Sequence, residues 1–169
     1  MKQYRLEILK EINLKYHIMK KLIIICLALC YTFIAGAQVK ISTGDPYISL
    51  QYKRTIVSGN TVMVDFVMTN FKNVEIEACL YNFVNLSFTD DEGNVYDNNS
   101  FKIDIGNSGQ ETAVFSPEVP LKVRLILTNI NEYATAITSI NYPYYYLTDP
   151  GRIATHRTMK IYNIPIPRD

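Results

Sequence analysis

Apolar and polar residues alternate along most of the chain after residue 46, and this alternation gives the first expectation about its structure. A period of two places successive side chains on opposite faces of a β-strand. We therefore predict half-buried strands at the alternating segments, each with one face in the core and one in water. These segments are residues 47–53, 61–69, 74–80, 84–89, 101–105, 112–115, 121–127 and 157–164.

Turn-forming residues separate the predicted strands. Ser58-Gly59-Asn60 joins the first two, which predicts an antiparallel hairpin. In residues 89–94 (TDDEGN), an aspartate can accept a hydrogen bond from the backbone two residues on, and Gly93 supplies the positive φ of a tight turn. Residues 116–120 contain two prolines and are expected to be an extended linker or edge, since proline donates no hydrogen bond. The segment 131–140 is ambiguous and is compatible with a helical turn at its start.

The spacing of strands and turns predicts the fold class. About seven to nine short strands, with turn signals roughly every 8–12 residues and no long amphipathic helix, are typical of an all-β, antiparallel immunoglobulin-like β-sandwich. A small barrel is the alternative. A composition of 48% hydrophobic and 20% charged residues excludes a multi-span membrane protein and a low-complexity polymer.

The N-terminal segment has the three parts of a secretory signal peptide. Lys20-Lys21 precedes an apolar run over residues 22–34, which ends in Ala35-Gly36-Ala37. A basic start, an apolar centre and small residues at the −3 and −1 positions fit export and cleavage before Gln38. The apolar stretch to residue 37 has 16 residues, fewer than the ~20 that a spanning helix needs. The membrane is therefore expected to be contacted only through a transient signal peptide.

This prediction divides the chain into residues 1–37, an N-terminal extension with the signal peptide, and residues 38–169, a single β-sandwich domain. Met19 precedes the two lysines and is the expected true start. Acylation of Cys30 would instead anchor the protein to a membrane, but the residue before a lipidated cysteine is small and Leu29 is not. We therefore expect a secreted or periplasmic protein without a lipid anchor.

Cleavage also changes the charge and the cysteine content. Residues 1–37 carry six of the 17 basic and two of the 16 acidic residues, so the remainder has 11 basic and 14 acidic residues and a net charge of −3. This balance excludes a dedicated nucleic-acid binder. Cys79 is the one cysteine left, so no internal disulfide can form. We interpret Cys79 as a small buried strand residue, and an intermolecular disulfide is the alternative.

Three segments follow one another as a strand ending in Thr-Asn, a hairpin, and a proline before a strand. They are residues 62–70 (VMVDFVMTN), 91–96 (DEGNVY) and 119–123 (VPLKV). This progression resembles the telokin-like immunoglobulin-fold domains of small secreted bacterial proteins, over most of residues 47–165. The resemblance implies the same sandwich and a role as a binding or assembly module, and it brings no catalytic residue.

The residues needed for most kinds of catalysis are missing after residue 37. His156 is the one histidine there, and no serine lies in a G-x-S-x-G elbow. A Cys79–His156 pair is conceivable, but Glu75 and Glu77 would raise the pKa of the thiol. A closed zinc site, a phosphate-binding glycine loop and a dinucleotide fingerprint are also absent from the sequence. We predict no enzyme, no cofactor and no nucleotide, with His156 solvated at the start of the last strand.

Four acidic residues crowd one hairpin: Asp90, Asp91, Glu92 and Asp97. We interpret them as a solvated turn. A calcium site is a second, weaker interpretation, because oxygen-rich loops suit a hard cation, although the spacing misses the helix–loop–helix calcium pattern. A third is glycoside hydrolysis, which needs two carboxyl groups facing each other across a cleft.

The sharpest functional signal is the segment 141–151 (NYPYYYLTDPG), which places four tyrosines between proline breaks. They are Tyr142, Tyr144, Tyr145 and Tyr146. In a strand, Tyr144 and Tyr146 share one face and Tyr145 takes the other, so at least one ring is expected to be exposed. Exposed tyrosines stack on sugars or anchor a protein partner. The alternative is that these rings cap the open end of the sandwich core.

Together these features predict a secreted or envelope-associated, non-enzymatic β-sandwich module for protein interaction or assembly. Its expected partner is a protein or glycan of the cell envelope. A carbohydrate-binding module that uses residues 142–146 is the alternative function, and a small hydrolase is a distant one.

Overall fold

The computed structural model describes residues 16, 19–21, 38–80, 86–106, 112–148 and 153–168. The chain divides into two units, Met1–Ala37 and Gln38–Asp169. In the first unit the described residues are helical. Among the described residues, no helix is long and apolar enough to cross a membrane. The apolar run of the predicted signal peptide and Cys30 lie outside the described residues.

The described part of the second unit consists of strands and one short 3-10 helix. The elements are β1 (Lys40–Ser42), β2 (Ile48–Ser58), β3 (Thr61–Asn70), β4 (Ile76–Cys79), β5 (Ser87–Asp90), β6 (Val95–Tyr96), η1 (Asn98–Ser100), β7 (Phe101–Ile105), β8 (Thr112–Phe115), β9 (Leu121–Leu127), β10 (Ala136–Leu147) and β11 (Ala154–Pro165). The predicted all-β class is confirmed, but the described residues form eleven strands and not the seven to nine that the sequence predicted.

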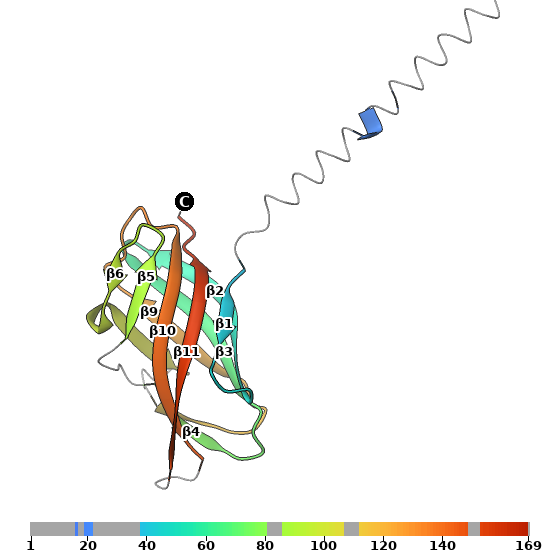
Figure 1. Ribbon diagram of the computed structural model, residues 1–169, viewed down its shortest axis with the longest axis vertical. Helices are drawn as coiled ribbons and strands as arrows, with labels where there is room; N and C mark the ends of the chain where they lie inside the picture. Colours follow the sequence, from blue (N-terminus) through green and yellow to red (C-terminus); the bar gives the residue numbers. More distant parts are fainter. Residues whose placement is uncertain are drawn as a thin grey trace, which may run out of the picture. The chain divides into compact units, whose positions relative to one another are not determined.

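These strands form two antiparallel sheets (Figure 1). Sheet A has the order β1-β11-β10-β4-β8, and β5, with β6 beside it, pairs with the other half of β10. Sheet B has the order β2-β3-β9-β7. The predicted hairpin is confirmed as β2 and β3, whose strands meet at Gly59 (φ 55°) and Asn60.

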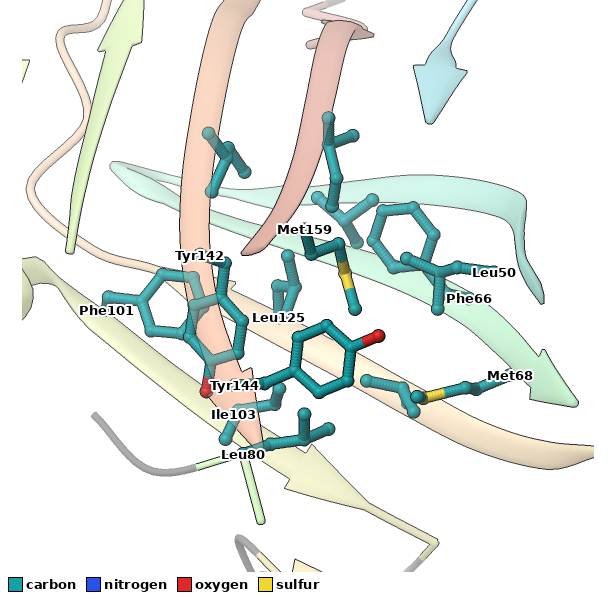
Figure 2. Close-up of a cluster of buried hydrophobic side chains, with 14 of the residues drawn as sticks. Leu50, Phe66, Met68, Leu80, Phe101, Ile103, Leu125, Tyr142, Tyr144 and Met159 are labelled. Carbon is teal, nitrogen blue, oxygen red and sulfur yellow. The ribbon is translucent and has the colours of Figure 1, made fainter. Parts of the chain in front are cut away.

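The two sheets bury one shared core. On β3 the predicted inward residues are fully or almost fully buried, and the same alternation recurs on β9 and β7. Figure 2 shows Tyr142 and Tyr144 of β10 and Met159 of β11 beside Phe66 and Leu125 of sheet B. Each sheet therefore turns one face inward, as the alternating pattern predicted.

The strand β10 differs most from its sequence pattern. It runs without interruption from Ala136 to Leu147, so Pro143 does not break it. The reason is its place in the sheet: β5 pairs with β10 only up to Asn141, and β4 pairs only from Tyr145 onward. Pro143 lies at the gap between these two ladders, where a residue without an N–H is tolerated.

Several other boundaries can be compared with the predictions. β8 and β9 coincide with their predicted ranges, and β5 begins at Ser87, with residues 81–85 outside the described part. Residues 131–134 form a turn, in which the Ala134 N–H donates to the Asn131 carbonyl, and not the start of a helix.

Candidate functional site

The structure buries three of the four tyrosines that the sequence singled out. Tyr142, Tyr144 and Tyr146 are each at most 2% exposed, because β10 turns this face toward sheet B. The expectation that they form a ligand or partner surface is therefore corrected for these three: their rings fill the core. Tyr145 is on the opposite face and is half-buried, and its ring lies 5.4 Å from that of His156.

The hydroxyl groups of two buried tyrosines hold the loop between β1 and β2. Tyr144 Oη donates to the Thr43 carbonyl at 2.8 Å, and Tyr146 Oη donates to Asp45 Oδ2 at 2.6 Å. A buried tyrosine needs such a partner for its hydroxyl. The aromatic segment therefore has a structural consequence that its sequence did not reveal, since it fixes a loop 101 residues away in the chain.

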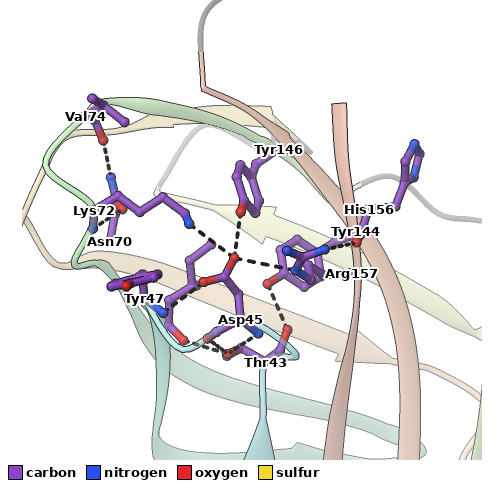
Figure 3. A network of polar contacts seen from close by, with 11 residues as sticks. Thr43, Asp45, Tyr47, Asn70, Lys72, Val74, Tyr144, Tyr146, His156 and Arg157 are labelled. Carbon is purple, nitrogen blue, oxygen red and sulfur yellow. Dashed lines mark hydrogen bonds and ion pairs between the residues drawn. The ribbon is translucent and has the colours of Figure 1, made fainter. Parts of the chain in front are cut away.

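Asp45 is buried and is the centre of a polar group, which we call the Asp45 cluster: Asp45, Tyr146, Lys72 and Arg157 (Figure 3). Lys72 Nζ lies 3.3 Å and Arg157 Nε 3.6 Å from Asp45 Oδ2. The other carboxylate oxygen accepts the Tyr47 N–H at 2.9 Å. One carboxylate is thus surrounded by two cations and two neutral donors.

These partners determine the charge of Asp45 and Lys72. Burial would raise the pKa of Asp45, but hydrogen bonds from Tyr146, the Tyr47 N–H and Lys72 outweigh it and lower that pKa. Burial would lower the pKa of Lys72, but its interactions with Tyr146 and Asp45 raise it. Both groups are therefore charged at neutral pH, and Asp45 is suited to holding loops together and not to donating a proton.

Lys72 also links aromatic rings across the cluster. Its ammonium group lies 4.8 Å from the centre of the Tyr47 ring and 5.0 Å from that of the Tyr146 ring. Cations at this distance from an aromatic face are attracted to it. Lys72 comes from the loop between β3 and β4, so that loop is fastened to the loop before β2.

Asn70 ties a third loop to the same end of the domain. Its side-chain amide donates to the carbonyls of Val74 and Phe115 at 2.9 and 3.0 Å, and its backbone carbonyl accepts the Glu118 N–H at 2.7 Å. The Phe71 N–H in turn donates to the Tyr47 carbonyl at 2.7 Å. Three loops, at residues 43–47, 71–75 and 116–120, are therefore held together.

These three loops carry apolar side chains that remain exposed. We call them the apolar rim: Tyr47, Phe71, Val74 and Val119, which are 55%, 52%, 50% and 53% exposed. Part of the rim lies next to the Asp45 cluster, since the Tyr47 N–H donates to Asp45, the Tyr47 ring lies under the Lys72 ammonium group, and Phe71 precedes Lys72 in the chain. Exposed apolar residues that gather on loops held rigidly from below suit contact with another molecule.

The four acidic residues of the 89–97 hairpin do not converge. Asp90 is buried and accepts from Tyr96 Oη, the Asn94 N–H and the Asn94 amide, while Asp91 accepts from Thr135 and the Ala136 N–H. Asp97 accepts the Asn99 N–H at the start of η1, and Glu92 is exposed. The idea of a fully solvated turn is therefore wrong for Asp90. In the described part of the chain, no group of three His, Cys, Asp or Glu side chains could hold a metal ion.

Cys79 and His156 take the positions that the sequence predicted, and they are not paired. Cys79 is buried and His156 is exposed. Tyr145 of β10 lies opposite Cys79 on one side and opposite His156 on the other. The two residues are therefore two strands apart, about 9–10 Å between backbones, which is too far for a proton to pass directly between them.

Comparisons with known proteins give little information about the function of this chain. No family model matches this sequence, and no curated protein matches it. One similar solved structure is that of a family 123 glycoside hydrolase from Clostridium perfringens, described as showing glycolipid glycan hydrolysis. Its TM-score is 0.38 and its sequence identity 9%, over 72% of this chain and 27% of the hydrolase. A likeness at this level carries no argument about function.

Proposed function

We propose that this protein is an exported, non-enzymatic module with an immunoglobulin-like sandwich fold, which binds a protein partner through the apolar rim. The observation that carries the proposal is the rim itself: four exposed apolar side chains on three loops that are fastened together. Protein interfaces have apolar and aromatic anchors at their centre and polar groups around them. The combination of Tyr47 and Phe71 with Lys72 and Arg157 fits that description.

The rigidity of the rim supports binding. A loop that must be ordered on association costs free energy, and a loop that is already held does not. Asp45, Lys72 and Asn70 hold the three loops by hydrogen bonds and ion pairs. The loops that carry the rim are therefore already ordered in the absence of a partner.

The division of the chain supports export. The second unit begins at Gln38, which is also the residue before which the sequence predicts signal-peptide cleavage. Removal of residues 1–37 would leave that unit intact, since β1 begins at Lys40.

Site-specific cross-linking tests the proposed interface. A photoreactive benzoylphenylalanine replaces Phe71 in the full chain, expressed in its own host, and the cross-linked products are identified by mass spectrometry. The control carries the same group at Tyr133, which is 72% exposed. Tyr133 lies near the opposite end of the domain, because Ile130 bonds to Asn60 in the β2–β3 turn, about 30 Å from Phe71 along β3. We expect one protein to be joined to position 71 and not to position 133. Equal products from both positions, or none, would contradict the proposal.

Carbohydrate binding is a second candidate, and one observation favours it. Tyr145 is half-buried, and its ring lies 5.4 Å from that of the exposed His156 on the outer face of sheet A. A thermal-shift screen against neutral oligosaccharides, with wild-type protein and a Tyr145→Ala variant, tests this candidate. A shift that the variant loses would favour it, and a shift that both proteins share would place the sugar elsewhere.

A further inference from the structure

We propose that the outer face of sheet B is a second binding surface and takes a linear acidic polysaccharide, a chain of sugars that carries carboxylate or sulfate groups. This surface is distinct from the apolar rim, which belongs to the loops at one end. The proposal rests on the strand register of sheet B and on the charges that the register brings together.

The register places one row of alternating charges across all four strands of the sheet. Arg54 of β2 lies opposite Asp65 of β3, Asp65 lies opposite Arg124 of β9, and Arg124 lies opposite Asp104 of β7. Asp65, Arg124 and Asp104 share the outer face, because their neighbours in the strands point into the core. Arg54 joins them on that face through its contact with Asp65. The row therefore crosses the full width of the sheet.

Three lysines lie beside this row. Lys122 is two residues from Arg124 on β9, and Lys102 is two residues from Asp104 on β7, so both share its face. Lys53 is the extra residue of a bulge in β2, and its ammonium group bonds to Gln51, which is also on this face. All three lysines are exposed. We call the set the basic face: Lys53, Arg54, Lys102, Lys122 and Arg124.

The basic face has a charge opposite to that of the domain. Its five cations, counted with the two carboxylates of the row, Asp65 and Asp104, give a net charge of +3. Residues 38–169 as a whole have 11 basic and 14 acidic residues, a net charge of −3. Cations gathered in this way attract an anionic polymer, and they raise the rate at which it associates.

Asp65 orients two of the cations and does not cancel the whole face. It accepts from Arg54 Nε at 2.9 Å and from Arg124 Nε at 2.6 Å and Nη2 at 3.0 Å. The Arg54 side chain is nevertheless 62% exposed, so its guanidinium group remains accessible from the solvent. A guanidinium held from one side can present its fork of N–H donors to a carboxylate or sulfate.

The apolar residues of this face decide which kind of polyanion fits. Its apolar side chains, such as Ile56, Met63 and Ile126, are only partly exposed, and none of the strongly exposed large apolar residues in the described part of the chain lies here. A protein interface needs apolar anchors, and a membrane surface needs side chains to insert. Single-stranded nucleic acid needs aromatic platforms for its bases. A hydrated, extended acidic polysaccharide needs none of these.

The test measures binding of the folded protein to immobilised heparin and polygalacturonate, which carry sulfate and carboxylate groups. We expect at least one of them to bind at about 0.05 M NaCl and to be released as salt screens the charges. A Lys102→Ala/Lys122→Ala variant should lose about fivefold or more in affinity, on the order of two weak ion pairs. The matched control is Lys40→Ala/Lys160→Ala, which removes two exposed lysines from sheet A and should bind within about twofold of wild type.

Several outcomes would overturn the proposal. These are no binding to either polysaccharide at low salt, an equal loss in both double variants, or tighter binding to anionic vesicles, duplex DNA or polyglutamate than to the polysaccharides. A Phe71→Ser variant, which alters the apolar rim, should bind the polysaccharide as wild type does. Failure of the basic face and failure of the proposed protein interface are therefore distinguished.

Discussion

Asp65 is a single residue whose charge is fixed by two guanidinium groups. The hydrogen bond from Arg124 is the main cause that lowers its pKa to about 2; burial acts in the opposite direction, and Arg54 adds to the lowering. A carboxyl group whose pKa is lower in the folded than in the unfolded state stabilises the fold above the unfolded value. That stabilisation is lost as the pH falls through the folded pKa.

We therefore expect Asp65→Asn to lower the free energy of unfolding at pH 7 by about 2 kcal/mol. The difference from wild type should persist down to the unfolded pKa, near 3.8, and disappear as the pH falls toward about 2. Urea unfolding at a series of pH values measures this. The exposed Glu92→Gln serves as the control and should change the free energy of unfolding at pH 7 by less than about 0.5 kcal/mol. A loss of the same size at every pH would mean that shape, and not charge, makes Asp65 important.

Tyr146 gives a second prediction at the scale of one residue. Tyr146→Phe removes the donor to Asp45 Oδ2 and leaves a buried carboxylate with one partner fewer. We expect a loss of about 1–3 kcal/mol in the free energy of unfolding. We also expect faster hydrogen exchange at the amides of Tyr47 and Phe71, since the loops they belong to are held through Asp45. The exposed Tyr162→Phe is the control, with a change within about 0.5 kcal/mol. Equal effects of the two substitutions would show that the hydroxyl of Tyr146 does not hold the loops.

The residues of the Asp45 cluster illustrate what local sequence patterns leave out. Asp45 follows a glycine and precedes a proline, which is the composition of a turn, and nothing nearby indicates that its carboxylate is buried. Lys72 and Arg157 lie in segments far away along the chain. Their meeting depends on which strands pair, and that is decided by packing of the whole domain. The alternation of the tyrosine segment predicted only that Tyr144 and Tyr146 share a face. Their hydroxyl groups need partners because the structure buries that face.

At the scale of elements, the loop between β1 and β2 lies directly against β11. Gly44 has a φ of +70°, and a Cβ built on it would lie 2.8 Å from the Thr158 carbonyl oxygen. Gly59, in the β2–β3 turn, has a φ of +55° and open space around its Cβ position. The two glycines share the left-handed conformation and differ in the approach of another strand.

Alanine at each position separates these two effects. Gly59→Ala should cost about 1–2 kcal/mol, the penalty of the left-handed region for a residue with a Cβ. Gly44→Ala should cost at least about 1 kcal/mol more, because the backbone of β11 must also move. Urea unfolding of both variants gives the comparison. If the two losses were equal, the contact with Thr158 would be too soft to matter.

The sequence predicted where the strands lie better than it predicted which face of each strand meets the other sheet. On β3 and β9 the alternation predicted which residues are buried, because each strand has one face in the core. On β10 the alternation predicted that Tyr144 and Tyr146 share a face, but it contains no information about which face meets the other sheet. From the sequence alone, Pro143 is expected to be a break, because proline cannot donate a hydrogen bond within a continuous ladder. On one side of β10, however, two short strands, β5 and β4, take the place of one long neighbour, and Pro143 lies between their ladders.

At the scale of the whole molecule, the two proposed surfaces lie on different parts of one domain. The apolar rim belongs to loops at one end, and the basic face belongs to the strands of sheet B. Neither proposal uses residues 1–37, and the second unit begins at Gln38. The domain that binds should therefore be the part of the chain that remains after export.

Export makes a prediction about the covalent structure of the whole chain. In a bacterial host that exports through the general secretory route, the mature protein should begin at Gln38 and lack the first 37 residues of the sequence. Intact mass and N-terminal sequencing of the extracytoplasmic fraction measure this. Ala37→Leu should block cleavage, because the peptidase pocket accepts only small residues at that position, while Ala28→Leu in the apolar run should not.

Each alternative would give a different result. A mature chain that began at an acylated Cys30 would be a lipoprotein, and its mass would exceed that of the unmodified peptide by the mass of the lipid. An uncleaved chain would retain Lys20-Lys21 and would remain with the membrane or the cytoplasm. Cleavage before Gln38 would leave only two residues before β1, which is an edge strand of sheet A. Thermal unfolding of the mature protein tests whether two residues before β1 are enough for a stable domain. We expect the mature protein to unfold in a single cooperative transition.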